Sequence, residues 1–223
     1  MNRKGEIIKA IQTLSGKYSA YEIFTDWIRC MALSISNTIT IFHDELWHER
    51  ELMYLDTMRK YTADEINKLC EMTGWLVETL EEGPDDVLGK IYMESGMGSK
   101  SAGQFFTPFH IAELTARMGI HAHMNDYIRG EKLTINEPTC GGGAMIIAAA
   151  KALRDEGLNY QKIMEVVAQD LDWKGVYMCY VQLSLLGIDA ICVQGDTLNC
   201  PYIKGQTERS HILYTPANMG VLL

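Results

Sequence analysis

The chain has 223 residues, of which 47% are hydrophobic and 22% are charged, as is usual for a globular protein with a substantial core. No apolar run reaches the roughly 18 residues of a membrane span, and the charged start lacks the apolar core of a secretory signal. We therefore expect a cytoplasmic protein with no membrane contact. The formal net charge of −9 argues against tight unaided binding to nucleic acid, because phosphate contacts need a basic surface.

Cysteine and histidine patterns give no sign of a metal site. The cysteines form no C-x-x-C pair, and the histidines form no H-E-x-x-H motif. Each cysteine lies in or beside an apolar segment, which favours buried reduced thiols over disulfides. The cysteines are Cys30, Cys70, Cys140, Cys179, Cys192 and Cys200. We expect no bound metal.

Residues 1–84 have the pattern of a helical N-terminal region. Apolar residues recur at helical spacing in residues 18–36 and again in residues 42–61. Thr62 and Glu65 form a capping-box pattern, which predicts that a further helix begins there. This helix is expected to end at a Gly-Pro pair, a strong helix breaker.

After a short predicted helix at residues 85–95 and a small-residue loop at residues 96–103, the pattern changes to alternating elements. A helix over residues 106–120 is opened by Thr107 and Pro108, since proline is well tolerated in a first helical turn. Strands are then expected at residues 132–138, 162–170, 189–196 and 211–216, with helices at residues 144–157 and 172–187. This alternation predicts a parallel sheet with helices on its faces.

The stretch EPTCGGGAMIIAAA, residues 137–150, places three consecutive glycines between a predicted strand and a predicted helix. Such a turn lets a ligand touch the main chain, and the helix start offers free N–H groups. The spacing fits neither the G-x-G-x-x-G of dinucleotide sites nor the G-x-x-x-x-G-K-[ST] of a phosphate loop. A nucleoside ligand without phosphates suits this turn better.

Two acidic residues end the next two predicted strands. Asp170 ends the second strand and Asp196 ends the third. Because ligands of parallel sheets bind outside the carboxyl ends of the strands, both acids would meet the ligand of the glycine turn. Asp170 could then accept hydrogen bonds from both ribose hydroxyls, and Asp196 one from an exocyclic amine.

Five motifs occur in the order found in a known family. They are GQFFTP (103–108), EPTCGGGAM (137–145), AQDLD (168–172), LSLLGID (183–189) and GDTL (195–198). Together they resemble the methylation subunit of type I restriction–modification systems, which are N6-adenine DNA methylases that use S-adenosylmethionine. The resemblance implies that residues 85–223 form a Rossmann-like methyltransferase domain that binds this cofactor.

The resemblance also implies which residues bind the cofactor. The segment from Gln104 to Pro108 would contact the methionine end, Asp170 the ribose, Leu171 the adenine ring and Asp196 its amine. The implied set is Gln104, Phe105, Phe106, Thr107, Pro108, Glu137, Thr139, Gly141, Gly142, Gly143, Asp170, Leu171, Asp196 and Leu198. Where the family commonly has aspartate and G-S-G, this chain has Glu137 and three glycines, which should preserve a backbone cradle.

The family's catalytic motif, Asn/Asp-Pro-Pro-Tyr/Phe, follows the fourth strand, and its aromatic ring stacks on the flipped base. Residues 215–218 of this chain, Thr-Pro-Ala-Asn, have neither the double proline nor the aromatic residue, so no catalytic residue is assigned. The sheet is also expected to be truncated after the fourth strand. Its edge would then be covered by the N-terminal helices or by a second chain, or the chain has been cut.

Three functions stay open at this point. The first is N6-adenine methylation of DNA, with DNA bound with help from another subunit, either a protein partner or a second copy. The second is a catalytically inactive methylase relative that binds S-adenosylmethionine and acts through a protein partner. The third is a glycine turn that serves only packing, or a methyltransferase for another substrate.

Overall fold

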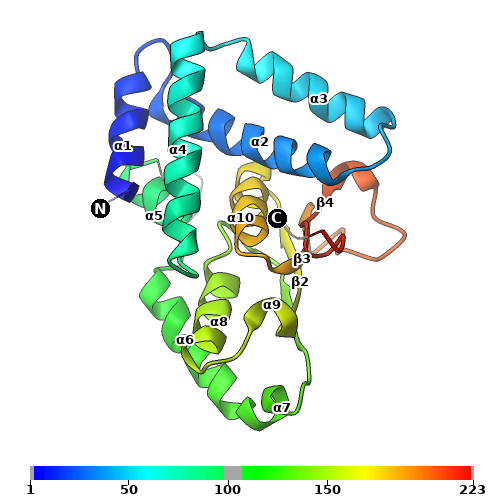
Figure 1. Ribbon diagram of the computed structural model, residues 1–223. Coiled ribbons are helices and arrows are strands. Elements are labelled where there is room, and N and C mark those ends of the chain that lie inside the picture. Colours follow the sequence, from blue (N-terminus) through cyan, green and yellow to red (C-terminus); the bar gives the residue numbers. More distant parts are fainter. Residues whose placement is uncertain (1–2, 98–106, 222–223) are drawn as a thin grey trace.

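The structure is a computed structural model that describes residues 3–97 and 107–221 (Figure 1). Helices form the first part of the chain. They are α1 (Arg3–Leu14), α2 (Ala20–Ile39), α3 (Glu45–Met58), α4 (Ala63–Glu81) and α5 (Val87–Glu94). Figure 1 shows α1 to α4 at one end of the molecule, with α2 packed on α3 and α1 on α4. Helices α1 to α4 thus make up most of residues 3–81.

Local sequence signals fix where these helices begin. At the start of α4 the Thr62 side chain accepts a hydrogen bond from the Glu65 backbone, and the Glu65 side chain accepts one from the Thr62 backbone. The predicted capping box is therefore present. Ser19 and Glu22 form the same arrangement at the start of α2. Each box satisfies backbone donors that a helix start would otherwise leave without partners.

The second half alternates helices and strands. The helices are α6 (Phe109–Ala122), α7 (Met124–Ile128), α8 (Ala144–Asp155), α9 (Tyr160–Ile163) and α10 (Trp173–Leu185), with a 3-10 turn, η1, at Arg209–His211. The strands are β1 (Leu133–Glu137), β2 (Met164–Asp170), β3 (Asp189–Gln194) and β4 (Ile212–Tyr214). All four predicted strands are present, whereas the short helices α7 and α9 have no counterpart among the predicted elements.

The four strands form one sheet in the order β1-β2-β3-β4. β1, β2 and β3 are parallel, but β4 runs antiparallel to β3. The prediction of a parallel sheet is thus confirmed for three strands and wrong for the fourth. A parallel connection needs a crossover segment, usually a helix, but residues 195–208 form only turns and bends. The chain therefore turns back at the carboxyl edge. The protein has a mixed α/β fold with a four-stranded sheet.

Helices cover one face of the sheet. Successive residues of a strand point to opposite faces, and α8 and α10 pack over the face that holds Val166 and Ala190, which are buried. On the other face, Thr134, Asn136 and Glu165 are exposed and line a shallow groove. We predicted helices on both faces; in the described part of the chain, they cover one.

A continuous hydrophobic core joins the N-terminal helices to the sheet. Trp27 of α2 and Leu76 of α4 belong to the same buried cluster as Leu88 of α5 and Val181 of α10. The core therefore crosses the predicted domain boundary after residue 84. Among the described helices, none is long and apolar enough to cross a membrane.

Lys174, in the first turn of α10, connects the two halves through polar contacts. Its Nζ donates to the Tyr92 hydroxyl of α5 at 2.9 Å and lies 3.2 Å from the Asp172 carboxylate. Burial lowers the pKa of Lys174, but the Tyr92 hydroxyl and the Asp172 carboxylate outweigh burial and raise it overall. The ammonium group therefore stays charged and holds α5 against the start of α10.

Asp26 performs a similar role within the helical half. It is 5% exposed, and its Oδ1 lies 2.5 Å from Arg29 Nη2. Its Oδ2 accepts hydrogen bonds from Lys60 Nζ and the Tyr61 hydroxyl, both at 3.0 Å. One buried carboxylate thus joins α2 to the segment between α3 and α4.

Replacing Asp26 by alanine should destabilise the protein by about 3–5 kcal/mol, because it leaves a partly buried guanidinium without its anion. Asp56→Ala provides a matched control, since Asp56 also pairs with an arginine three residues away, Arg59, but on the surface. That variant should change the free energy of unfolding by no more than about 0.5 kcal/mol. Urea denaturation measures both, and equal effects would contradict this role of Asp26.

Candidate functional site

The carboxyl ends of β1, β2 and β3 meet at one edge of the sheet, as predicted. The backbone N–H of Cys140 donates to the Gln169 carbonyl at 2.9 Å, which joins the loop after β1 to β2. The N–H of Gly195 donates to the Asp170 carbonyl at 2.9 Å, which joins the loop after β3 to β2. The Thr197 hydroxyl then donates to the Pro138 carbonyl at 2.8 Å. Three loops distant in sequence thus form one continuous rim.

Asp170 lies directly against the glycine turn. Its Oδ2 accepts a hydrogen bond from the Gly141 N–H at 2.8 Å, and its Oδ1 accepts one from the Asp172 N–H at 2.9 Å. Asp170 is half-buried, so its carboxylate supports the turn and still borders solvent. The structure thus places Asp170 beside the glycine turn, whereas its predicted contact with a ribose stays a prediction.

Interior packing accounts for two of the three glycines. A Cβ on Gly142 would lie 3.2 Å from Met178 Cε and 3.5 Å from Asp86 Oδ1. Gly143 has φ +92°, and a Cβ there would lie 3.1 Å from Cys179 Sγ. We predicted that the approach of a ligand excludes side chains from this turn. At Gly142 and Gly143, however, neighbouring elements of the protein itself exclude them.

Gln182 holds the turn from beneath and was missed by sequence reasoning. It is fully buried, and its Nε2 donates to the Gly142 carbonyl at 2.8 Å and to Asp86 Oδ1 at 3.0 Å. Its Oε1 accepts from the Leu88 N–H at 2.9 Å. Burial raises the pKa of Asp86, while the hydrogen bond from Gln182 opposes this rise. One signal was available, namely a glutamine inside the otherwise apolar run VYMCYVQLSLL.

Gly175 is a second residue that sequence reasoning missed. A Cβ at this position would lie 3.2 Å from Asp170 Cγ and 3.4 Å from the Gly141 Cα. The first turn of α10 therefore packs directly on Asp170 and the glycine turn. Glycine is a poor helix former, so a glycine in the first turn of α10 indicates, already in the sequence, that another segment packs closely there.

Asp196 lies on the exposed part of the rim. Its Oδ1 accepts from the Leu198 N–H at 2.9 Å, and its Oδ2 accepts from Asn199 Nδ2 at 2.6 Å. The Asn199 side chain and these backbone donors lower the pKa of Asp196, so its carboxylate is ionised near neutral pH. The side chains of Leu171 and Leu198 are 69% and 93% exposed. The rim thus combines the Asp196 carboxylate with exposed apolar side chains.

Only some of the remaining predicted cofactor-binding residues lie in the described part of the chain. Glu137 Oε1 accepts hydrogen bonds from the Thr139 N–H and hydroxyl at 3.3 and 3.4 Å. Thr107 and Pro108 are exposed at the start of α6, and Pro108 is its N-cap residue. No hydrogen bond among the described residues joins Thr107 to the rim. Gln104, Phe105 and Phe106 lie outside the described residues.

Comparison with known proteins gives the family. The family model described as N-6 DNA methylase matches residues 84–218, which is more than half of the chain. The chain belongs to the N-6 DNA methylase family. No curated protein matches it. The match includes the glycine turn, Asp170 and Asp196, and it supports a methyltransferase-like role.

Residues 215–218, the segment that the family resemblance compares with a catalytic motif, lie at the opposite end of β3 from this rim. The Thr215 hydroxyl is buried and donates to the Ile188 carbonyl at 2.7 Å, and Asn218 Nδ2 donates to Asp189 Oδ1 at 2.6 Å. Both partners lie at the amino end of β3. Because β4 is antiparallel to β3, the residues after β4 lie at the amino ends of the parallel strands. The glycine turn lies at their carboxyl ends.

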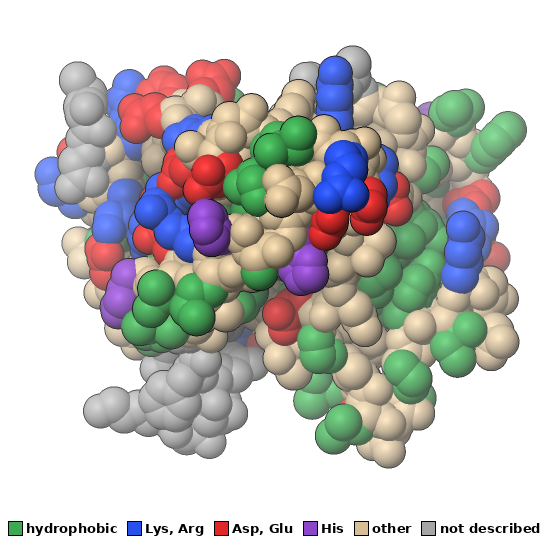
Figure 2. Space-filling model, turned by 90° about the horizontal axis from the view of Figure 1, so that it is seen from below, with side chains coloured by type: hydrophobic (Ala, Val, Ile, Leu, Met, Phe, Trp, Pro, Cys, Tyr) green, Lys and Arg blue, Asp and Glu red, His purple; other side chains and the backbone are tan. Residues whose placement is uncertain are grey.

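The molecular surface shows mixed charge. On the face seen in Figure 2, acidic and basic side chains lie next to one another over the described residues. Apolar side chains are interspersed with them. Ile111, Leu114 and Met118 of α6 are among the exposed apolar residues of the described chain. A DNA backbone requires a basic surface, so this face is poorly suited to binding DNA alone.

The cysteines are all reduced. Cys140, Cys179 and Cys192 are buried near the glycine turn, and hydrogen bonds between thiols and burial raise the pKa of Cys140. The prediction of burial is wrong for Cys70, on the outer face of α4, and for Cys200, in the loop after β3, since both are exposed. In the described ranges, no cluster of His, Cys, Asp or Glu side chains could hold a metal ion.

Gly89→Ala should test the support beneath the turn, because a Cβ there would lie 2.1 Å from Asp86 Oδ2. Moving Asp86 would break its bonds to Gln182 and to the Gly89 N–H, so we expect a loss of about 1–3 kcal/mol in unfolding free energy. Gly74→Ala is the matched control, since nothing lies within 4 Å of its Cβ position in α4.

The control should stabilise the protein by about 0.5–1 kcal/mol, because alanine is the better helix former. Thermal or urea unfolding followed by circular dichroism measures both variants. If Gly89→Ala proved as stable as the parent chain, the stability of the protein would not depend on the present position of Asp86.

Proposed function

We propose that this chain binds S-adenosylmethionine at the carboxyl edge of β1, β2 and β3, and that it is the cofactor-binding subunit of a DNA adenine methyltransferase. The contact between Asp170 and the Gly141 N–H carries this proposal, because it joins the glycine turn to the carboxylate best suited to a ribose. Family membership supports the same cofactor class.

Asp170 can accept hydrogen bonds from a ribose without losing its own. Each carboxylate oxygen has two lone pairs, and each Asp170 oxygen accepts one backbone bond from the Gly141 or the Asp172 N–H. A second lone pair on each oxygen is left for the two ribose hydroxyls. The backbone bonds also hold the carboxylate still, so binding would cost little additional ordering.

The exposed leucines suit the adenine ring of the cofactor. Leu171 and Leu198 expose apolar surface at a rim that is otherwise polar, and a flat ring between them would remove that surface from water. Asp196 is ionised and stands two residues from Leu198, where it can accept a bond from the adenine amine.

The methionine end of the cofactor would lie over the glycine turn. Its ammonium group calls for an acceptor, and the Glu137 carboxylate supplies one at the start of the turn. The first turn of α8, directly after Gly143, offers backbone N–H groups to the carboxylate. When bound, the cofactor supplies an activated methyl group on sulfur. The chain's own residues would position it and hold it at the rim.

A catalytically inactive, cofactor-binding relative is the second candidate. The observation that favours it is the place of residues 215–218, because Thr215 and Asn218 are bonded at the far edge of the sheet. For methyl transfer, a partner subunit would have to bring the base-binding groups and the basic surface. The net charge of −9 agrees with such a division of labour.

Asp170→Asn should weaken binding of S-adenosylmethionine at least tenfold, about 1.4 kcal/mol, because an amide replaces one acceptor oxygen by a donor. Asp189→Asn is the matched control, since Asp189 starts β3 at the opposite edge. Isothermal titration calorimetry measures both variants against the parent chain. The proposal is falsified if the parent chain does not bind the cofactor.

Methyl transfer separates the two candidates. The chain alone, and the complex that copurifies with it from its own cells, would be incubated with methyl-labelled S-adenosylmethionine and duplex DNA. We expect label on adenine only with the complex, and its loss in Asp196→Ala. Cofactor binding without any transfer in either sample would establish the inactive relative.

A further inference from the structure

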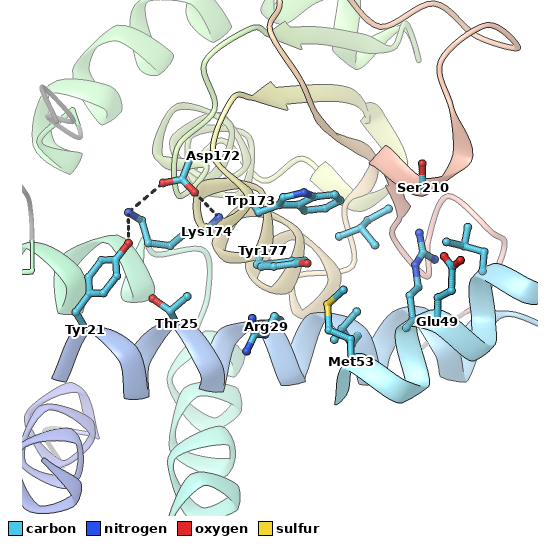
Figure 3. Close-up of a pocket in the computed structure, with 14 residues that line it drawn as sticks. Tyr21, Thr25, Arg29, Glu49, Met53, Asp172, Trp173, Lys174, Tyr177 and Ser210 are labelled. Atoms are coloured by element: carbon cyan, nitrogen blue, oxygen red, sulfur yellow. Dashed lines mark hydrogen bonds and ion pairs between the residues drawn. The ribbon is translucent and has the colours of Figure 1, made fainter. Parts of the chain in front are cut away.

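A pocket lies between the N-terminal helices and the start of α10, apart from the glycine turn. Its volume is about 400 Å³, and residues of α2, α3 and α10 form its walls. Figure 3 shows Thr25 and Arg29 of α2 on one side of this space and Trp173 and Tyr177 of α10 on the other. Pockets of small organic ligands occupy roughly 300–1,000 Å³, so the volume suits such a molecule.

One wall of the pocket is aromatic. The rings of Trp173 and Tyr177 stack with centroids 5.0 Å apart and an interplanar angle of 24°. His211 extends the arrangement, with its ring 6.3 Å from that of Trp173 and an interplanar angle of 16°. Trp173 is only half-buried. A flat, partly accessible aromatic surface of this kind favours a planar ligand, because rings stack with an offset at such distances.

Arg50 lines the pocket with a guanidinium that forms no ion pair with the described residues. Its Nη1 donates to Ser36 Oγ at 2.8 Å and its Nη2 to the Ile212 carbonyl at 2.9 Å, and both acceptors are neutral. No carboxylate of the described residues lies within ion-pair distance of this guanidinium. Two of its five N–H groups are thus used, and burial lowers its pKa. An anion in the pocket would offset the cost of burying this cation.

The other cations of the pocket are already balanced. Arg29 Nη2 lies 2.5 Å from Asp26, and Lys174 Nζ lies 3.2 Å from Asp172. Glu49 also lines the pocket, but it is exposed at its rim. Arg50 is therefore the charge that an incoming anion would meet.

Two buried polar atoms of the pocket lack hydrogen-bond partners within the described part of the chain. They are the Thr25 hydroxyl oxygen and Arg29 Nε. Both atoms are closed to solvent, so leaving them without partners is a cost of packing this wall, and they are not contacts for a ligand. The pocket thus offers an aromatic wall and a guanidinium without an ion-pair partner among the described residues to a single ligand.

We propose that this pocket binds a small aromatic anion of the class of nucleoside monophosphates. The ring lies along the Trp173–Tyr177 wall, and the phosphate lies at Arg50. The ligand touches the first turn of α10, whose other side packs on Asp170, so the two sites share one helix start. This site is separate from the proposed cofactor site and does not rest on it.

Calorimetric titration of the full chain with 5′-UMP and 5′-GMP tests the proposal, with S-adenosylmethionine present in excess. Neither nucleotide carries adenine, which keeps them distinct from the ligand proposed for the glycine turn. We expect at least one of them to bind and Arg50→Gln to weaken it at least tenfold. Arg59→Gln makes the same change of net charge at the end of α3, where its partner Asp56 is on the surface, and should bind as the parent does.

Further probes divide the ligand into its parts. The nucleoside without phosphate should bind more weakly and should be insensitive to Arg50→Gln, and inorganic phosphate alone should bind more weakly than the nucleotide. Met53→Trp serves as a second variant, because Met53 lines the pocket and is 45% exposed, so a larger side chain can fill the space without entering the core. It should abolish nucleotide binding.

Three results would overturn the proposal. They are no binding of either nucleotide by the parent chain, unchanged binding by Met53→Trp, and equal affinities for Arg50→Gln and Arg59→Gln when all variants are folded. Binding of a short single-stranded oligonucleotide but of neither mononucleotide would also reject it, because the pocket would then belong to a nucleic-acid surface. If Arg50→Gln does not fold, Met53→Trp decides.

Discussion

The side-chain amide of Gln182 is the interaction on which the candidate site depends. It lies at the centre of the protein and joins three segments distant in sequence, namely the glycine turn through the Gly142 carbonyl, the start of α5 through Asp86 and Leu88, and α10 itself. Hydrogen bonds in such a dry environment are strong, and each one left unmade is costly. The position of the turn is therefore fixed by the core beneath it, before any ligand arrives.

The site on the opposite side of the turn follows from this constraint. Since Gly142 is fixed from beneath, the neighbouring Gly141 N–H can point at Asp170, and Gly175 allows α10 to approach both. A rim supported in this way presents its carboxylate and its exposed leucines in one fixed arrangement, which is what a small ligand needs for affinity. The helical half contributes through α5, so it belongs to the site's support as well as to the pocket beside α10.

Membership of the N-6 DNA methylase family favours a site for the methyl donor. The direction of β4, in contrast, separates residues 215–218 from that site. The rim retains the features that suit the cofactor. The segment that would bind the base is fixed at the far edge by Thr215 and Asn218, and the net charge of −9 does not favour DNA. These features agree with our proposal of a chain that holds the cofactor and relies on a partner for DNA.

The sequence alone determined the features that depend on neighbours along the chain, such as the capping box at Thr62, the glycine turn, the acid that ends β2 and the acid shortly after β3. Local hydrogen bonds and strand ends produce these whatever the rest of the molecule does. Only the tertiary structure decided the reversal of β4, the role of Gln182 and the exposure of Cys70 and Cys200. These depend on which surfaces meet across long sequence separations, and a hydrophobic pattern records that a residue is apolar but not which partner it packs against.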